Sequence, residues 1–358
     1  MNLLETLYEI HYKNDTYFDR KTKILSNKTL ILGPRKSGKS HLVIDYLQEY
    51  AVSSYLYIDF LDERLNTEEI ESKKLETFIQ NNHIKLLILE NFDFSINLPK
   101  VDKIIITSDD STRRLENFHT ISLYPLDFEE FILFDKKHSN IEQLFNQFAN
   151  QGSFPEIATY HDNDRYNKMQ KITRDLFQTR NEFLVFKKFC ELQGTKISLF
   201  QLYNQLKPKM KISKDFIYKC SADLQHRELI VLLEKYQQPK AAKKVYLFDF
   251  ALKNALSFKR DFLKRFENMV FLELYKRNKE IFYNDIIDFW LPLEHEGIIC
   301  APFTPIVSIK AKVKKMISHL SALQAKKIWI TTLGNEGAFE QDGVTFVLIP
   351  FWDWALQN

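Results

Sequence analysis

Residues 33–40 of the chain have the types and spacing of a phosphate-binding loop. They read GPRKSGKS, which matches G-x-x-x-x-G-K-[ST] at every fixed position. In such a loop the glycines allow a turn in which backbone N–H groups converge on phosphate oxygens, and the helix that follows presents its positive end. Lys39 is expected to reach the β and γ phosphates, and the Ser40 hydroxyl to ligate Mg²⁺. The residues predicted to hold the nucleotide are Gly33, Pro34, Arg35, Lys36, Ser37, Gly38, Lys39, Ser40 and His41.

A second set of candidates ends the apolar run LLILENFDF, residues 86–94. A phosphate-loop site needs an acid here to hold the magnesium through water, commonly followed by a glutamate that activates the attacking water. In the natural register Glu90 is the metal-holding acid and Asn91 takes the place of the base. An amide can orient water but cannot accept its proton, so slow hydrolysis is expected. Shifting the register makes Glu90 the base but leaves Leu89 where an acid is needed; Asp93 is a further alternative.

A third polar position is expected at the tip of the next strand. The segment IIITSDDS supplies Thr107 and Ser108, either of which could sense the γ-phosphate or position water. Ordinary capping of the strand end explains these two residues equally well. The candidate catalytic residues are therefore Glu90, Asn91, Thr107 and Ser108.

These residues need a parallel α/β sheet to position them. Apolar runs at 29–32, 53–60, 84–91 and 101–108 are typical of strands buried on both faces, and residues 40–50 have helical spacing after the first of them. After the segment 121–134 the pattern changes to helices up to about Arg180, with breaks at Gly152 and Pro155, which suggests a helical lid.

Residues 181–260 read as three helices followed by two strands joined by QQPKAA, which predicts a winged helix-turn-helix. Ser213 is the expected N-cap of the third helix, with Asp215 in its first turn. The chain carries a net charge of +3, but residues 183–260 hold 16 Lys and Arg against 6 Asp and Glu, a local charge of +10 that leaves −7 on the remainder. This segment is a candidate contact for nucleic acid, although a solvated lysine surface has the same composition.

Length and composition limit the broad class. The chain has 358 residues, of which 45% are hydrophobic and 27% charged, and no apolar run approaches the roughly 20 residues that cross a bilayer. The N-terminus lacks the pattern of a secretion signal, so the cytoplasm is the expected compartment. Cys190, Cys220 and Cys300 are widely spaced and are expected to fill cores. The expected domains are a nucleotide-binding core at 1–125, a lid at 126–180, a winged helix at 181–260 and a mixed α/β domain at 261–358.

Three further segments resemble a known family, the AAA-type ATPases of archaea and bacteria that join a phosphate-loop domain, a winged helix and a restriction-endonuclease-like domain. LYPLDFEEF looks like the family's L-x-P-L-S-F-x-E-F, GSFPEIA like its G-G-F-P-E, and KKVYLFDFALKNAL like its K-x-Y-x-x-D-x-G-L, with Ala251 in place of glycine. The resemblance implies ATP and Mg²⁺ as cofactors. No guanine-reading Asn-Lys-x-Asp run occurs in the sequence.

The chain departs from this family at two places. The family usually has D-E where this chain has Glu90 and Asn91. Where the family often has a G-R pair that reaches a neighbouring subunit's nucleotide, this chain has RRLENFHT, in which Arg113 or Arg114 could substitute. Assembly into a homo-oligomer is therefore left open.

The resemblance also implies a layout for the last domain, in which carboxylates bind Mg²⁺ and a Glu/Gln-x-Lys follows on the next strand. Glu267, Asp288 and Lys310 take these places, with Lys310 ending a strand-like SIK. Ser308 stands where the acid or amide belongs, so a degraded nuclease core is expected. Nearby Lys312, Lys314 and Lys315 could contact phosphate or solvate a helix.

The sequence thus favours an ATP-binding protein with weak or absent hydrolysis, whose nucleotide state controls contacts of the winged helix and the C-terminal domain. Two alternatives remain at this point. One is a competent ATPase in which another group accepts the proton. The other is a DNA-binding regulator or scaffold in which the phosphate loop is only structural.

Overall fold

The computed structural model describes residues 3–12, 19–66, 70–135, 139–158, 162–277 and 279–357. The chain divides into two compact units. Unit 1 comprises residues 1–125 with 226–228, and unit 2 comprises residues 126–225 and 229–358. Within the described ranges, no helix has both the length and the apolar composition needed to cross a membrane.

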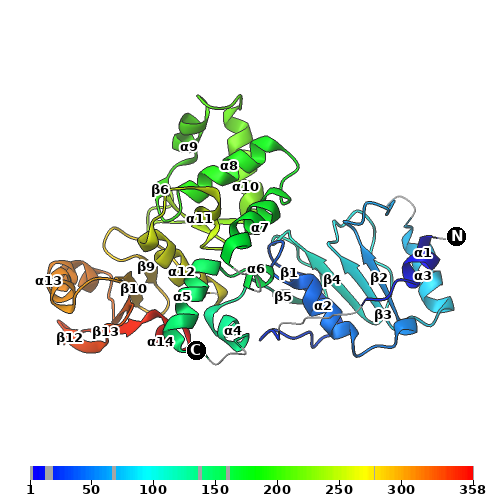
Figure 1. Cartoon of the computed structure of the whole chain (residues 1–358), viewed down its shortest axis with the longest axis horizontal. Helices are drawn as coiled ribbons and strands as arrows, with labels where there is room; N and C mark the ends of the chain where they lie inside the picture. Colours follow the sequence, from blue (N-terminus) through cyan, green and yellow to red (C-terminus); the bar gives the residue numbers. More distant parts are fainter. Residues whose placement is uncertain are drawn as a thin grey trace. The chain divides into compact units, whose positions relative to one another are not determined.

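Unit 1 is built on a five-stranded sheet in the order β2-β3-β4-β1-β5, and every pairing in it is parallel (Figure 1). The strands β1 to β4 match the four predicted apolar runs, whereas β5 was not predicted. Its strands are β1 (Lys28–Leu32), β2 (Tyr55–Asp59), β3 (Leu86–Glu90), β4 (Ile104–Ser108) and β5 (His119–Ser122). Its helices are α1 (Leu3–Tyr8), α2 (Lys39–Leu47) and α3 (Ser72–Asn81), with a short 3-10 turn η1 (Val52–Ser54).

The sheet of unit 1 is covered on both faces, which explains why its strands are apolar at nearly every position. Leu30, Leu56 and Leu87 pack with α1 and α3 on one face. On the other face Ile31 and Ile88 pack with α2. The parallel register places the carboxyl ends of β1, β3 and β4 at one edge of the sheet.

The first part of unit 2 is helical, as predicted. Its helices are α4 (Phe128–Leu133), α5 (Ile141–Gln151), α6 (Pro155–Ala158) and α7 (Asp162–Arg174). Gly152 ends α5 with a φ of 87°, and Pro155 begins α6. Both predicted breaks are therefore confirmed.

The segment predicted as a winged helix contains four helices, one more than predicted, and a small antiparallel sheet in the order β6-β8-β7. The elements are α8 (Arg180–Glu191), β6 (Lys196–Ile197), α9 (Leu199–Leu206), α10 (Lys214–His226), β7 (Ile230–Leu233), β8 (Lys243–Leu247) and α11 (Leu252–Leu256). The Phe216 amide donates to Ser213 Oγ at 3.0 Å, so Ser213 caps α10 as expected. The classification as a winged helix stays a prediction.

The last part of unit 2 holds a mixed sheet in the order β12-β13-β11-β10-β9, with parallel pairs at its centre and antiparallel pairs at both edges. Its strands are β9 (Phe289–Leu291), β10 (Glu296–Cys300), β11 (Lys327–Thr332), β12 (Gly337–Gln341) and β13 (Val344–Pro350). The helices are α12 (Phe262–Lys276), α13 (Ile306–Ala322) and α14 (Phe351–Ala355).

One sequence prediction in this part is wrong. The segment TPIVSIK was expected to be a strand, but α13 begins at Ile306, so Ser308 and Lys310 lie in its first turns. Ile309, Val313, Met316 and Leu320 are buried at spacings of four, three and four, which is the helical period. This continuous apolar stripe outweighs the local preference of the β-branched residues for strand.

Residues from all three predicted segments of unit 2 share one hydrophobic cluster. Phe148 from the lid segment, Phe250 from the segment 181–260, and Phe266 with Phe351 from the last segment belong to it. The ring centroids of Phe148 and Phe250 lie 4.8 Å apart. The further division of this unit at residues 180 and 260 stays a prediction.

Candidate nucleotide site

The phosphate loop follows β1 directly and leads into α2, at the carboxyl edge of the unit 1 sheet. Gly33 has a φ of 152°, and a Cβ there would lie 2.0 Å from the Leu123 carbonyl oxygen, so no other residue fits. Gly38 is the N-cap of α2 with a φ of 99°. Both glycines of the motif thus have the conformational role expected of them.

Lys39 is folded back over its own loop. Its side chain is buried, and Nζ donates to the carbonyl oxygens of Gly33 at 2.6 Å and Pro34 at 3.1 Å. Burial lowers the pKa of Lys39 to about 8, although Glu90 and Asp109 oppose this shift. A nearby anion would stabilise the charged form of a lysine held this way, because the anion compensates for the water that burial removes.

Ser40 and Glu90 are brought together from α2 and the end of β3. Ser40 Oγ donates to Glu90 Oε1 at 2.7 Å, while Glu90 Oε2 is buried and has no hydrogen-bond partner among the described residues. Burial raises the pKa of Glu90, and the Ser40 hydrogen bond and the Lys39 charge oppose that rise. A hydroxyl beside a carboxylate with an unpartnered oxygen fits a hard cation such as Mg²⁺, which would neutralise charge on bound phosphates.

Asn91 follows Glu90 and is hydrogen-bonded to residues of the two neighbouring strands, β2 and β4. Its Nδ2 donates to Asp59 Oδ1 at 2.9 Å, and its backbone N–H donates to Thr107 Oγ1 at 2.9 Å. Asn91 has a φ of 51°, a left-handed conformation that asparagine tolerates better than most residues. Of the two predicted strand-tip residues, Thr107 contacts this group, whereas Ser108 Oγ donates to the Phe92 carbonyl at 3.3 Å.

Two residues at the site were missed by the sequence analysis. Asp59 ends β2 opposite Glu90 in the parallel register, and its Oδ1 accepts the hydrogen bond from Asn91 Nδ2. Arg20 holds the loop from outside, donating to the carbonyl oxygens of Ser37 at 2.7 Å and Tyr124 at 2.6 Å. Only the position of Asp59 at the end of an apolar run could have indicated its role.

The remaining loop residues divide between buried and exposed positions. Arg35 Nε donates to Asp109 Oδ2 at 2.9 Å, and Ser37 Oγ is buried with no hydrogen-bond partner among the described residues. Pro34 is buried, whereas Lys36 and His41 are exposed. The side chains of Lys36 and His41 therefore lie outside the enclosed part of the site, and only the backbone of these two residues belongs to the loop and the start of α2.

The alternative residues named from the sequence have local roles. Arg113 Nε donates to Asp110 Oδ2 at 2.8 Å, and its guanidinium lies over the Phe94 ring. Arg114 donates to nearby carbonyl oxygens, among them that of Ser111. Asp93 Oδ1 accepts from the Ser95 amide, a turn interaction.

The carboxylates predicted for a nuclease layout lie in unit 2, with a lysine between them. Lys244 Nζ lies 2.7 Å from Glu267 Oε1 and 3.6 Å from Asp288 Oδ1, and its side chain is 7% exposed. Burial alone would lower the pKa of Lys244, but the two carboxylates raise it above its usual value. Lys264 Nζ also lies 3.2 Å from Glu267 Oε2, so two lysines accompany the two carboxylates. Lys310 does not join this group, since it lies on α13 with its Nζ over the Phe339 ring.

Unit 1 therefore has the arrangement of a P-loop NTPase: a strand, a glycine loop and a helix at the carboxyl edge of a parallel sheet. Within the described ranges, no group of three or more His, Cys, Asp or Glu side chains could hold a metal ion by itself.

Comparison with known proteins identifies similar chains but no matching family model. An uncharacterized protein of Methanocaldococcus jannaschii is 26% identical over an alignment of 401 positions, which covers 94% of this chain and 90% of that protein. Among solved structures, the Walker-type ATPase of Pyrococcus abyssi is 14% identical with a TM-score of 0.48, covering 70% of this chain and 99% of that one. The Orc1 protein of Aeropyrum pernix, solved in complex with DNA, is 12% identical with a TM-score of 0.32, covering 66% of this chain and 87% of that one.

Proposed function

We propose that the chain is an ATP-binding protein of the AAA type that hydrolyses ATP slowly or not at all. The observation that carries the proposal is the group formed by Lys39, Ser40 and Glu90 around the glycine loop. Lys39 supplies a buried cation for the β and γ phosphates. Ser40 and the unpartnered oxygen of Glu90 supply ligands for Mg²⁺. The choice of adenine rests on the family resemblance.

Slow hydrolysis follows from the residue after Glu90. Asn91 can hold a water molecule through its amide, but it cannot take a proton from that water at neutral pH. Its Nδ2 is also occupied by Asp59. The proposal therefore assigns Asn91 to positioning rather than to proton transfer.

The test measures Mg-ATP affinity and turnover in the intact protein and in Lys39→Ala. We expect the wild type to bind Mg-ATP at millimolar concentration or tighter, with turnover below about one per second. Lys39→Ala should weaken binding at least about tenfold, since a charge-assisted contact is lost. Lys85→Ala is a matched control, because it removes an exposed lysine just before β3, at the opposite edge of the sheet. Wild-type protein that fails to bind Mg-ATP would refute the proposal and favour a purely structural loop.

A second candidate, a competent ATPase, is favoured by one observation. Asp59 lies at the same sheet edge as Glu90 and is hydrogen-bonded to Asn91. Its carboxylate could accept the proton that Asn91 cannot. Turnover well above one per second would select this candidate.

The proposal extends to the rest of the chain. The bound nucleotide is proposed to control the contacts that the winged-helix segment and the C-terminal segment make with a partner. Support for this comes from the family resemblance and from the concentration of positive charge in residues 183–260.

A further inference from the structure

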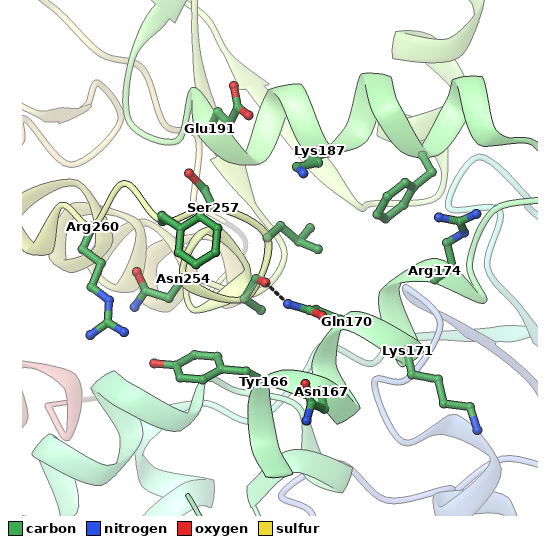
Figure 2. Close-up of a pocket in the computed structure, with 14 residues that line it drawn as sticks. Tyr166, Asn167, Gln170, Lys171, Arg174, Lys187, Glu191, Asn254, Ser257 and Arg260 are labelled. Atoms are coloured by element: carbon green, nitrogen blue, oxygen red, sulfur yellow. Dashed lines mark hydrogen bonds between the residues drawn. The ribbon is translucent and has the colours of Figure 1, made fainter. Parts of the chain in front are cut away.

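A cavity of about 740 Å³ lies within unit 2, between α7, α8, α11 and the loop that leads into α12. Its volume falls in the range of small-molecule sites. Figure 2 shows the labelled side chains arranged around it, with Gln170 of α7 donating to the Ala255 carbonyl at 2.7 Å. This bond ties α7 to α11 and helps to define one wall.

The cavity is strongly basic. Lys171, Arg174, Lys187 and Arg260 line it, against the single acid Glu191, which pairs with Lys188. None of the four cations makes a salt bridge with any residue that the structure describes. Uncompensated like charges around a concave surface concentrate the field and attract anions.

The positive charges are spread around the cavity. Figure 2 shows Arg260 on one side, Lys171 and Arg174 on the other side, and Lys187 between them. A single terminal phosphate would use one end of such a site. A ligand with several phosphates spaced along it would use both.

Aromatic side chains line the same cavity. They are Tyr166, Phe183 and Phe258, and Phe258 is fully exposed at 107%. The Arg174 guanidinium lies 5.0 Å from the Phe183 ring centroid, so a cation and a ring are already combined on one wall. The side-chain amides of Asn167 and Asn254 add donors and acceptors. Tyr166 and Phe183 are partly buried against the hydrophobic cluster, and the Arg165 guanidinium lies 5.0 Å from the Tyr166 ring centroid, so Phe258 is the exposed ring of the three. An exposed ring beside cations is a combination that binds unpaired bases and their phosphates.

We propose that this cavity binds a short stretch of single-stranded nucleic acid, with a base against the exposed Phe258 ring and phosphates paired with the four cations. The cavity lies in unit 2, whereas the phosphate loop lies in unit 1. The cavity also gives the basic segment 183–260 a specific location for contact, since Lys187, Phe258 and Arg260 belong to that segment.

The experiment measures binding of a labelled thymidine oligonucleotide of about a dozen residues, with a 5′-hydroxyl end, to the full chain over a series of salt concentrations. Neutralisation of about four phosphates predicts a slope of log affinity against log salt of about −3. Lys171→Ala/Arg174→Ala should reduce the magnitude of this slope by about 1.4. Phe258→Ala should weaken binding by about tenfold and leave the slope unchanged, because it removes stacking and no charge.

Two controls test whether this cavity is the site. Lys314→Ala/Lys315→Ala removes two exposed lysines from α13, and it should leave the slope unchanged. In the absence of ATP, Lys39→Ala should leave oligonucleotide binding intact, which separates this site from the phosphate loop. The proposal is overturned by absence of binding at low salt, by an equal loss of slope in the α13 variant, or by thymidine monophosphate binding as tightly as the oligonucleotide. The last result would assign the cavity to free nucleotides.

Discussion

The lowered pKa of Lys39 makes the affinity of the site for Mg-ATP depend on pH. Burial lowers its pKa to about 8, so the free protein holds the ammonium below that pH and loses it above. A bound triphosphate favours the ammonium and raises the pKa again. We therefore expect Mg-ATP affinity to fall as pH rises above 8, by up to about tenfold per pH unit. Calorimetric titration across this range measures the effect.

Lys39→Arg is the control for this titration, because a guanidinium stays protonated throughout. Its affinity should be weaker than that of the wild type near neutral pH, owing to the different shape, but flat above pH 8. A wild-type affinity that stays constant above pH 8 would contradict the proposed role of the ammonium.

The Asp59–Asn91 pair allows the two hydrolysis candidates to be separated. The double variant Asp59→Asn/Asn91→Asp exchanges the amide and the carboxylate and keeps their hydrogen bond. If Asn91 limits hydrolysis, the exchange places a proton acceptor next to Glu90, and turnover should rise by about a hundredfold. Steady-state phosphate release measures it. Asp59→Asn alone should leave turnover unchanged; a fall of about a hundredfold would instead identify Asp59 as the base of a competent ATPase.

The candidate residues that could be predicted from the sequence are those recognisable from their local spacing. Lys39 and Ser40 follow from one contiguous motif, and Glu90 follows from its position at a strand end. Asp59 could not be found in this way, because its contact with Asn91 depends on β2 pairing with β3, 31 residues later. Arg20 lies outside any regular element and has no periodic signal.

At the scale of elements, the two family-like segments GSFPEIA and KKVYLFDFALKNAL contact each other through one buried carboxylate, that of Asp249. Asp249 follows β8 and accepts hydrogen bonds from the Ser153 amide, from Ser153 Oγ at 2.9 Å and from the Phe154 amide at 3.2 Å. A Cβ on Gly152 would lie 2.6 Å from Asp249 Oδ1, which explains the glycine. The turn between α5 and α6 is thereby hydrogen-bonded to the turn that follows β8.

We expect Asp249→Asn to lower the free energy of unfolding of unit 2 by about 3 kcal/mol, because a buried amide donor would face backbone donors. Urea unfolding followed by fluorescence measures the change. Ser153→Ala removes only the hydroxyl contact and should cost about 1 kcal/mol. Equal losses in the two variants would show that the carboxylate is not what fastens these elements.

Elements with a strong period were predictable, and short or edge elements were not. The four apolar strands of unit 1 were predicted because each is buried on both faces. The strand β5 has four residues, of which only Ile121 is buried, so it lacks that signal. The strand β12 begins at Gly337 and has no buried residue, and β10 contains Gly297 and was also missed.

At the scale of the whole molecule, the chain consists of two compact units, and the phosphate loop lies in the first. A ligand that binds the native state stabilises the unit that holds it, by about 2.7 kcal/mol at a hundred times its dissociation constant. Scanning calorimetry of the full chain should therefore show two transitions. Mg-ATP should raise the transition of unit 1 by about 10 °C.

The proposed control by nucleotide state predicts a second effect in the same measurement. The nucleotide must change the free energy of unfolding of unit 2 as well. We expect Mg-ATP to raise the second transition too, by a smaller amount, and Lys39→Ala to abolish both shifts. Asp249→Asn identifies the transition of unit 2, since it should lower that transition alone. A shift confined to unit 1 would support nucleotide binding but exclude nucleotide control of unit 2, whereas no shift in either would refute both.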